Sequence, residues 1–176
     1  MRIRVMSKVL GSVMGVLPFY LFTFLPLQAT SIKSPNGNVE LTFVVEQGRP
    51  VYSMTYKGRE VIKPSHLGLE LAKDKHATLG VNEHDLMDDF VLVEVNTSTF
   101  DETWQPVWGE TRNIRNHYNE LCVKLLQEFL LPRPKRPADP NIHERPATVM
   151  RELILRFRVY DDGIGFRYEF PQQHSL

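Results

Sequence analysis

From Val39 onward, apolar and polar residues alternate along much of the chain. In the first run the apolar residues Val39, Leu41, Phe43 and Val45 stand two positions apart. Successive side chains of a β-strand point to opposite faces, so this spacing predicts a strand with one buried face. Residues 47–50, which include a glycine and a proline, then end the run.

The same alternation recurs in later segments and favours an all-β fold. Apolar residues alternate from Leu153 to Val159, Asp161-Asp162-Gly163 supplies a turn, and residues 166–170 return, which predicts a hairpin over residues 152–170. With no long amphipathic helix in the pattern, we expect an antiparallel β-sandwich. Shorter strands are predicted at residues 51–56, 60–62, 67–72 and 90–95, the last of them apolar enough to be covered on both faces.

Residues 118–129 are ambiguous. Leu121 and Leu125 suit one face of a helix, whereas Leu121, Val123 and Leu125 suit one face of a strand. A short apolar run is not decided by its period alone, and the neighbouring strands favour a strand here. Two stretches are predicted loops: the polar residues 73–88, and residues 130–148, which contain five prolines and several basic residues.

The first 29 residues have the order of a secretory signal peptide. Three basic residues fall within the first eight positions, residues 9–27 are almost wholly apolar, and small Ala29 closes a plausible cleavage site. An uncleaved membrane anchor is the alternative, which Pro18 and Pro26 disfavour because they interrupt a spanning helix. We therefore expect residues 30–176 to be exported to a bacterial periplasm or exterior, with no stable membrane span after cleavage.

Charge and cysteine content exclude several classes of function. Lys and Arg number 21 and Asp and Glu number 21, so the basic excess of a nucleic-acid-binding protein is absent. A single cysteine, Cys122, excludes an internal disulfide and a multi-cysteine metal site. Its apolar surroundings predict a buried, unreactive thiol. Glycine-rich phosphate loops, nucleophile elbows and zinc-protease motifs are also missing from the sequence.

Polar and aromatic residues are densest between Phe100 and Glu120, where both tryptophans lie. Tryptophan rings stack on sugar C–H surfaces, and carboxylates and amides bind hydroxyl groups, so this stretch could line a carbohydrate site. Equally, it could pack a domain interface. His117 and Glu120 would share a face only on a helix, so metal ligation there is disfavoured. The candidates for sugar binding or a domain interface are Trp104, Trp108, Glu110, Arg115, His117, Asn119 and Glu120, with no catalytic or metal-binding residue assigned.

This stretch also carries a family resemblance. The segments FDETWQPVWGE (100–110) and IRNHYNEL (114–121) closely resemble the N-terminal domain of glycoside hydrolase family 97, the bacterial α-glucosidase and α-galactosidase family. Three further segments match in the family's order: SPNG (34–37), VIKPSHLGLEL (61–71) and LRFRVYDDGIGFRYEFPQQ (155–173). Together they cover most of residues 31–176. The loop at residues 130–148 is longer than the resemblance implies, and that at residues 73–88 is shorter.

The resemblance implies a galactose-mutarotase-like supersandwich that packs against a catalytic (β/α)₈ barrel. Family members are typically exported and calcium-dependent, and they cleave α-linked glucosides or galactosides with carboxyl groups of the barrel. We expect the chain to end inside the N-terminal domain. The carboxylate that this domain gives to the family's calcium site would lie beyond that end, so no cofactor is assigned to these residues.

Three hypotheses follow from the sequence. The first is the partial N-terminal domain of a family 97 glycosidase, expected to hydrolyse no α-linked oligosaccharide by itself. The second is a stand-alone carbohydrate-binding module that uses Trp104 and Trp108. The third is a non-functional truncated gene product.

Overall fold

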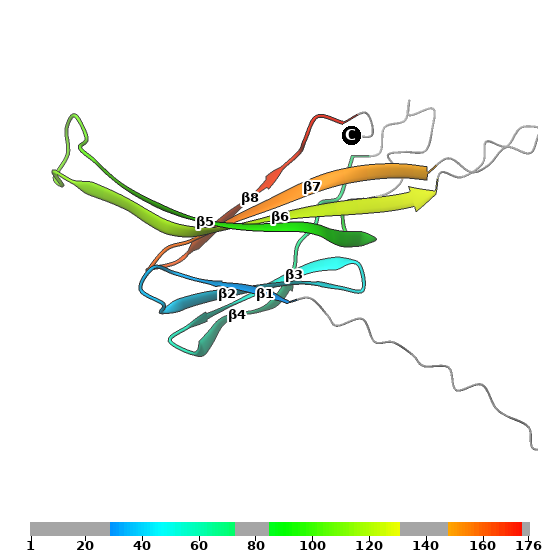
Figure 1. The fold of residues 1–176 in the computed structure, drawn as a ribbon, viewed down its shortest axis with the longest axis horizontal. Coiled ribbons are helices and arrows are strands. Elements are labelled where there is room, and N and C mark those ends of the chain that lie inside the picture. Colours follow the sequence, from blue (N-terminus) through cyan, green and yellow to red (C-terminus); the bar gives the residue numbers. More distant parts are fainter. Residues whose placement is uncertain (1–28, 73–84, 131–147, 174–176) are drawn as a thin grey trace, which may run out of the picture.

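The computed structural model describes residues 29–72, 85–130 and 148–173. These residues form two four-stranded antiparallel sheets that face each other, as the sequence predicts (Figure 1). In each sheet the strands follow one another in chain order. The first sheet holds β1 (Thr30–Lys33), β2 (Val39–Glu46), β3 (Arg49–Tyr56) and β4 (Arg59–His66). The second holds β5 (Phe90–Trp104), β6 (Ile114–Leu130), β7 (Thr148–Val159) and β8 (Ile164–Glu169).

Short turns set the register of the first sheet. Gln47-Gly48 joins β2 to β3 and Lys57-Gly58 joins β3 to β4, and all four residues have φ between 49° and 78°. Two consecutive positive φ values are what a two-residue hairpin turn of type I′ requires, and its twist matches that of the flanking strands. Across the first of these turns Glu46 pairs with Arg49 and Val39 pairs with Tyr56.

The core lies between the inner faces of the two sheets, and the predicted alternation places its residues there. In β7 every second residue from Arg151 to Val159 is buried, and the residues between them are half-buried. Residues 118–129 lie within β6, which confirms a strand rather than a helix. The inner-face residues that are buried in this core are Val39, Leu41, Phe43, Met54, Leu121, Val123, Leu125, Leu153, Leu155, Phe157 and Val159.

Aromatic rings join the two sheets within this core. Phe157 of β7 lies 5.8 Å from Phe43 of β2 and 6.1 Å from Tyr52 of β3, measured between ring centroids. Phe166 of β8 contacts both Tyr52 and Phe157 at 5.7 Å. Such tilted ring pairs add to the free energy gained by burying their apolar surface.

Two turns, one from each sheet, also meet. The amide N–H of Asn36, in the SPNG turn between β1 and β2, donates to Asp161 Oδ1 at 2.9 Å. Asp161 belongs to the turn between β7 and β8, so two segments that carry the family resemblance lie side by side across the sandwich.

Residues 67–72 do not form the predicted strand. The fourth strand of the first sheet is β4, which extends the predicted 60–62 on both sides. Leu69 instead makes a single bridge to Leu86, with backbone hydrogen bonds of 2.9 and 3.0 Å. Leu86 is fully buried, although its segment was predicted to be a polar loop. Gln127 Nε2 holds that segment by donating to the carbonyls of Asp85 and Asp88, a long-range pairing that no local pattern reveals.

Strand β5 also differs from its prediction. It runs to Trp104 rather than ending near residue 95, and Val91 and Val93 are exposed rather than covered on both faces. A bulge between Leu92 and Glu94 shifts the register with β6, leaving Val93 as the extra residue.

The described residues include no helix with the length and apolarity needed to cross a bilayer. The predicted signal peptide (1–29, apart from Ala29) lies outside the described residues, as do most of the predicted loops at 73–88 and 130–148.

Replacing Gly68 by alanine should destabilise the sandwich. A Cβ atom there would lie 2.6 Å from Met87 Sδ and 2.9 Å from the carbonyl oxygen of Leu86. Overpacking of this kind costs about 1–3 kcal/mol, measurable as a lower urea midpoint of unfolding. Gly163→Ala is the matched control, because a Cβ at Gly163 meets nothing within 4 Å and should change stability by less than ~0.5 kcal/mol. Equal losses in the two variants would contradict this account of Gly68.

Candidate functional site

The seven candidate residues lie along the β5–β6 hairpin. This hairpin, which we call the arm, projects beyond the first sheet (Figure 1). In an antiparallel pair, directly opposed residues share a face, so the register assigns each side chain to one side. We call the side that faces the first sheet the inner face, and the opposite side the outer face. Thr97 lies opposite the core residue Leu121, which marks their side as inner.

The tip of the arm carries exposed apolar side chains. Trp104 ends β5 opposite Ile114, and its side chain is 47% exposed. In the loop between the strands, Val107 and Trp108 are 102% and 88% exposed. Glu110 lies in the same loop and is exposed. Exposed apolar groups gathered in one place commonly mark an interaction surface.

The inner face of the arm carries three of the candidates, and two of them are engaged within the chain. Arg115 donates from Nε and Nη2 to the Asp101 carboxylate at 2.8 and 2.6 Å, and hydrogen bonding from Arg115 lowers the pKa of Asp101. Asn119 donates to the carbonyl of Lys33 at 2.7 Å and accepts from Thr99 at 2.8 Å, so it ties the second sheet to the first. His117 lies opposite Asp101.

Glu120 lies on the outer face, opposite Arg158 of β7. It therefore does not share a face with His117, and the disfavoured metal pair does not form. Among the described residues, no three His, Cys, Asp or Glu side chains gather closely enough to hold a metal ion.

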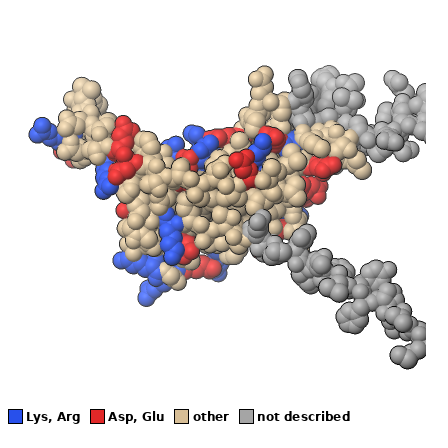
Figure 2. Space-filling view, viewed as in Figure 1, with Lys and Arg blue, Asp and Glu red and all other residues tan. Residues whose placement is uncertain are grey.

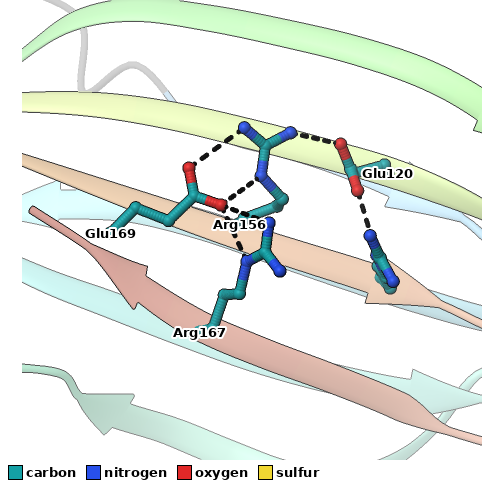
Figure 3. A network of polar contacts seen from close by, with 5 residues as sticks. Glu120, Arg156, Arg167 and Glu169 are labelled. Atoms are coloured by element: carbon teal, nitrogen blue, oxygen red, sulfur yellow. Dashed lines mark hydrogen bonds and ion pairs between the residues drawn. The ribbon is translucent and has the colours of Figure 1, made fainter. Parts of the chain in front are cut away.

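Glu120 is part of an ion-pair network that crosses three strands (Figure 3). Its carboxylate pairs with Arg156, and its Oε2 accepts from Arg158 Nε at 3.0 Å. Arg156 also donates from Nε and Nη2 to Glu169 at 2.7 and 3.1 Å. Arg167 pairs with the same Glu169 carboxylate at 2.6 Å. We call these five residues, Arg158, Glu120, Arg156, Glu169 and Arg167, the arginine network.

Both carboxylates of the arginine network stay ionised to low pH. The hydrogen bond from Arg156, together with that from Arg167, lowers the pKa of Glu169 to about 2, against the opposing effect of burial. Burial likewise opposes ionisation of Glu120, but its hydrogen bonds from Arg156 and Arg158 outweigh it and lower its pKa. Neither group therefore holds a proton at neutral pH.

Aromatic rings continue the outer face from the arginine network toward the arm. The Arg158 guanidinium lies 4.6 Å from the centre of the Tyr118 ring, and Tyr118 stacks on Phe100 at 5.2 Å. In Figure 2 acidic and basic side chains are intermixed along the upper surface, over the second sheet. Cys122 also lies on this face, half-buried rather than buried, and burial raises the pKa of its thiol, which agrees with an unreactive group.

Sequence reasoning missed most of the arginine network. It placed Glu120 among the candidates for sugar binding or a domain interface, whereas Glu120 pairs with Arg156 and Arg158. The predicted hairpin at residues 152–170 contained a signal that points to the arginine network. Its turn sets Arg156 directly opposite Arg167, and like charges in that position need carboxylates nearby.

Residues 32–176 match the sequence profile of a family described as glycosyl-hydrolase 97 N-terminal. The chain belongs to glycoside hydrolase family 97. Its described strands are thus the family 97 N-terminal sandwich, as the sequence resemblance implied.

Comparison with solved structures agrees with this family assignment. The chain is similar to a family 97 enzyme from Pseudoalteromonas sp. strain K8 in complex with acarbose, with 28% identity and a TM-score of 0.61. A variant of an enzyme from that strain in complex with panose gives the same values. A β-arabinopyranosidase is 23% identical with a TM-score of 0.59, which supports the fold alone. Each comparison covers 82% of this chain and 18% of the solved chain.

Replacing Glu169 by glutamine should make the stability of the fold less dependent on pH in the acidic range. A carboxylate whose folded pKa is lowered stabilises the fold above its ordinary pKa, and this contribution is lost as pH falls. For Glu169 the loss should occur between pH 4.5 and about 2. Urea midpoints measured from pH 6 to pH 2.5 should therefore fall less steeply in Glu169→Gln than in the native chain. Glu128→Gln, at an exposed position of β6, serves as the control, and its urea midpoint should fall with pH as steeply as that of the native chain. Equal slopes in all three proteins would contradict the stabilising role of the Glu169 carboxylate.

Proposed function

We propose that residues 30–176 act as the N-terminal sandwich of an exported, calcium-dependent α-glycosidase of family 97 that cleaves α-linked glucosides or galactosides. In this role the sandwich docks on the catalytic barrel through its arm and does not supply the reacting carboxyl groups. The observation that carries the proposal is the family match over residues 32–176. The acarbose and panose complexes of the Pseudoalteromonas enzymes support an α-linked oligosaccharide as the substrate class.

The state of the carboxylates supports a role outside catalysis. Hydrolysis of a glycosidic bond needs one carboxyl group that gives a proton to the leaving oxygen and a second that acts as nucleophile or base. The proton donor needs a raised pKa to stay protonated near neutral pH. In Glu120 and Glu169 the pKa is lowered, and each carboxylate accepts hydrogen bonds from two arginines. These groups are suited to holding strands together rather than to proton transfer.

The exposed arm supports docking. Trp108 and Val107 project from its tip with almost no cover within the described part of the chain, and Trp104 lies where the tip loop begins. Aromatic residues of this kind dominate the binding free energy of protein interfaces when a partner buries them. The hydrogen bond from Gln105 to Asn113, 2.9 Å long, closes the base of the loop that carries Val107 and Trp108 at the end of the β5–β6 strand pair.

A chimera tests docking. In a Pseudoalteromonas family 97 enzyme, residues 30–176 would replace the matching segment, and hydrolysis of p-nitrophenyl α-glucoside would be measured with and without acarbose. We expect acarbose-sensitive hydrolysis that falls at least about tenfold in Trp108→Ala, because an aromatic anchor is lost. Tyr56→Ala, an exposed aromatic position on the first sheet, is the control and should keep the activity. The purified chain alone should show no turnover; turnover by the chain alone, or an indifferent Trp108→Ala chimera, would overturn the proposal.

The exposure of Trp108 also favours a second candidate function, a stand-alone carbohydrate-binding module. An uncovered indole ring could stack on a sugar face without any partner domain. Calorimetry with maltooligosaccharides separates the two functions: saturable heat that disappears in Trp104→Ala and Trp108→Ala supports the module. Heat no different from buffer at millimolar sugar excludes it and leaves docking as the role of the arm.

A further inference from the structure

The outer face of the β7–β8 hairpin contains a hollow at Gly165. The register places Arg156 opposite Arg167 and Arg158 opposite Gly165, so these four positions form a block in which three corners are arginines. The fourth corner has no side chain, and a Cβ atom built there would meet nothing within 4 Å. The hollow has a volume of about 130 Å³ and is lined by the block and Phe166.

The charges around the hollow do not balance. The arginine network has three guanidinium groups and two carboxylates, so one positive charge remains without a counter-ion in the network. Figure 3 shows Arg156 between Glu120 and Glu169, with its donors directed at both carboxylates. The surplus therefore belongs to the two outer arginines, Arg158 and Arg167.

The outer arginines have donors left over. Arg158 uses Nε to reach Glu120 and also hydrogen-bonds Tyr160. Arg167 uses Nε and Nη2 to reach a single oxygen of Glu169. A guanidinium carries five N–H donors in a rigid planar fork, so each has several more to offer. Their side chains are 38% and 61% exposed, and both border the hollow, which makes these donors accessible to a ligand.

We propose that the Gly165 hollow binds one small oxyanion: a carboxylate, phosphate or sulfate group. Guanidinium forks bind planar and tetrahedral oxyanions through paired, charge-assisted hydrogen bonds, which are stronger than those to neutral groups. The volume is several times the roughly 30 Å³ of a water molecule, enough for one such group. A neutral sugar hydroxyl would leave the surplus charge in place, so an anion is the better match. The site stands independently of the proposed docking role.

Two sources could supply this group: a free ion from solution, or a carboxylate side chain of another protein segment. The donors that recognise them are the same. Inorganic phosphate serves as the probe for the first source and acetate for the second.

Titration of the purified chain tests the site. Sodium phosphate replaces sodium chloride at constant ionic strength, and the ¹H–¹⁵N signal of Gly165 is followed by NMR. We expect a saturable shift with a dissociation constant in the millimolar range, raised at least about tenfold in Arg167→Gln. A linear, unsaturable response to both phosphate and acetate would overturn the proposal, as would an unchanged constant in Arg167→Gln. Tighter binding of phosphate assigns the site to a free ion, and tighter binding of acetate to a protein carboxylate.

A second pair of variants remains informative if Arg167→Gln unfolds. Gly165→Asp places a carboxylate in the hollow, and Gly165→Asn places a neutral side chain of the same shape there. We expect the Asp variant to melt about 2–4 °C above the Asn variant at low salt, with the gap shrinking in 1 M NaCl. Gly163→Asp and Gly163→Asn form the control pair in the same hairpin, beside Asp161 and Asp162, where the Asp variant should melt no higher. Equal melting temperatures of the two Gly165 variants, or the same gap at both glycines, would contradict an anion site.

Discussion

The contact between the inner faces of the two sheets is the interaction on which the remaining structure depends. One cysteine excludes an internal disulfide, and the described residues contain no helix that could cover a sheet. Among the described residues, the apolar faces of β2, β3, β6 and β7 leave water by packing against each other. Phe157 is central to this contact, because its ring touches Phe43 and Tyr52 of the opposite sheet and Phe166 of its own. The turn that carries Asp161 is held to the SPNG turn.

The outer face follows from this inner packing. Because the strand period is two, burial of Leu155, Phe157 and Val159 obliges Arg156 and Arg158 to point outward. Two arginines on one strand and Arg167 opposite them would repel one another without carboxylates. Glu120 comes from β6 and Glu169 from β8, so the counter-ions arrive from both neighbouring strands and connect three strands through their side chains. The network is thus a consequence of where the core lies.

The sequence predicts this arrangement where the deciding interactions are between residues close together in the chain, and fails where they join segments far apart in it. The 152–170 hairpin and the strand at residues 118–129 are confirmed, because local alternation and a local turn determine them. The strand predicted at residues 67–72 is wrong, because Leu69 is held by Leu86 from a distant segment. The bulge between Leu92 and Glu94 and the partners of Glu120 both depend on how β6 pairs with its neighbours, which a period does not reveal. The seven site candidates all lie in the β5–β6 hairpin, and the register distributes them over the arm tip and two opposite faces.

That distribution separates two kinds of surface along one sheet. At the arm, side chains that could contact a partner are apolar and uncovered, as at Trp108 and Val107. Nearer the sandwich, polar groups are already engaged: Asn119 with Lys33, Glu120 with two arginines. Engaged groups offer little to a sugar hydroxyl, since a new hydrogen bond would replace an existing one and leave a half-buried partner unsatisfied. The lowered pKa values of Glu120 and Glu169 follow from the same pairing, so the feature that stabilises the sheet also prevents its carboxylates from donating a proton. A sandwich built in this way is suited to holding and presenting the arm, while proton transfer requires carboxyl groups in a different environment.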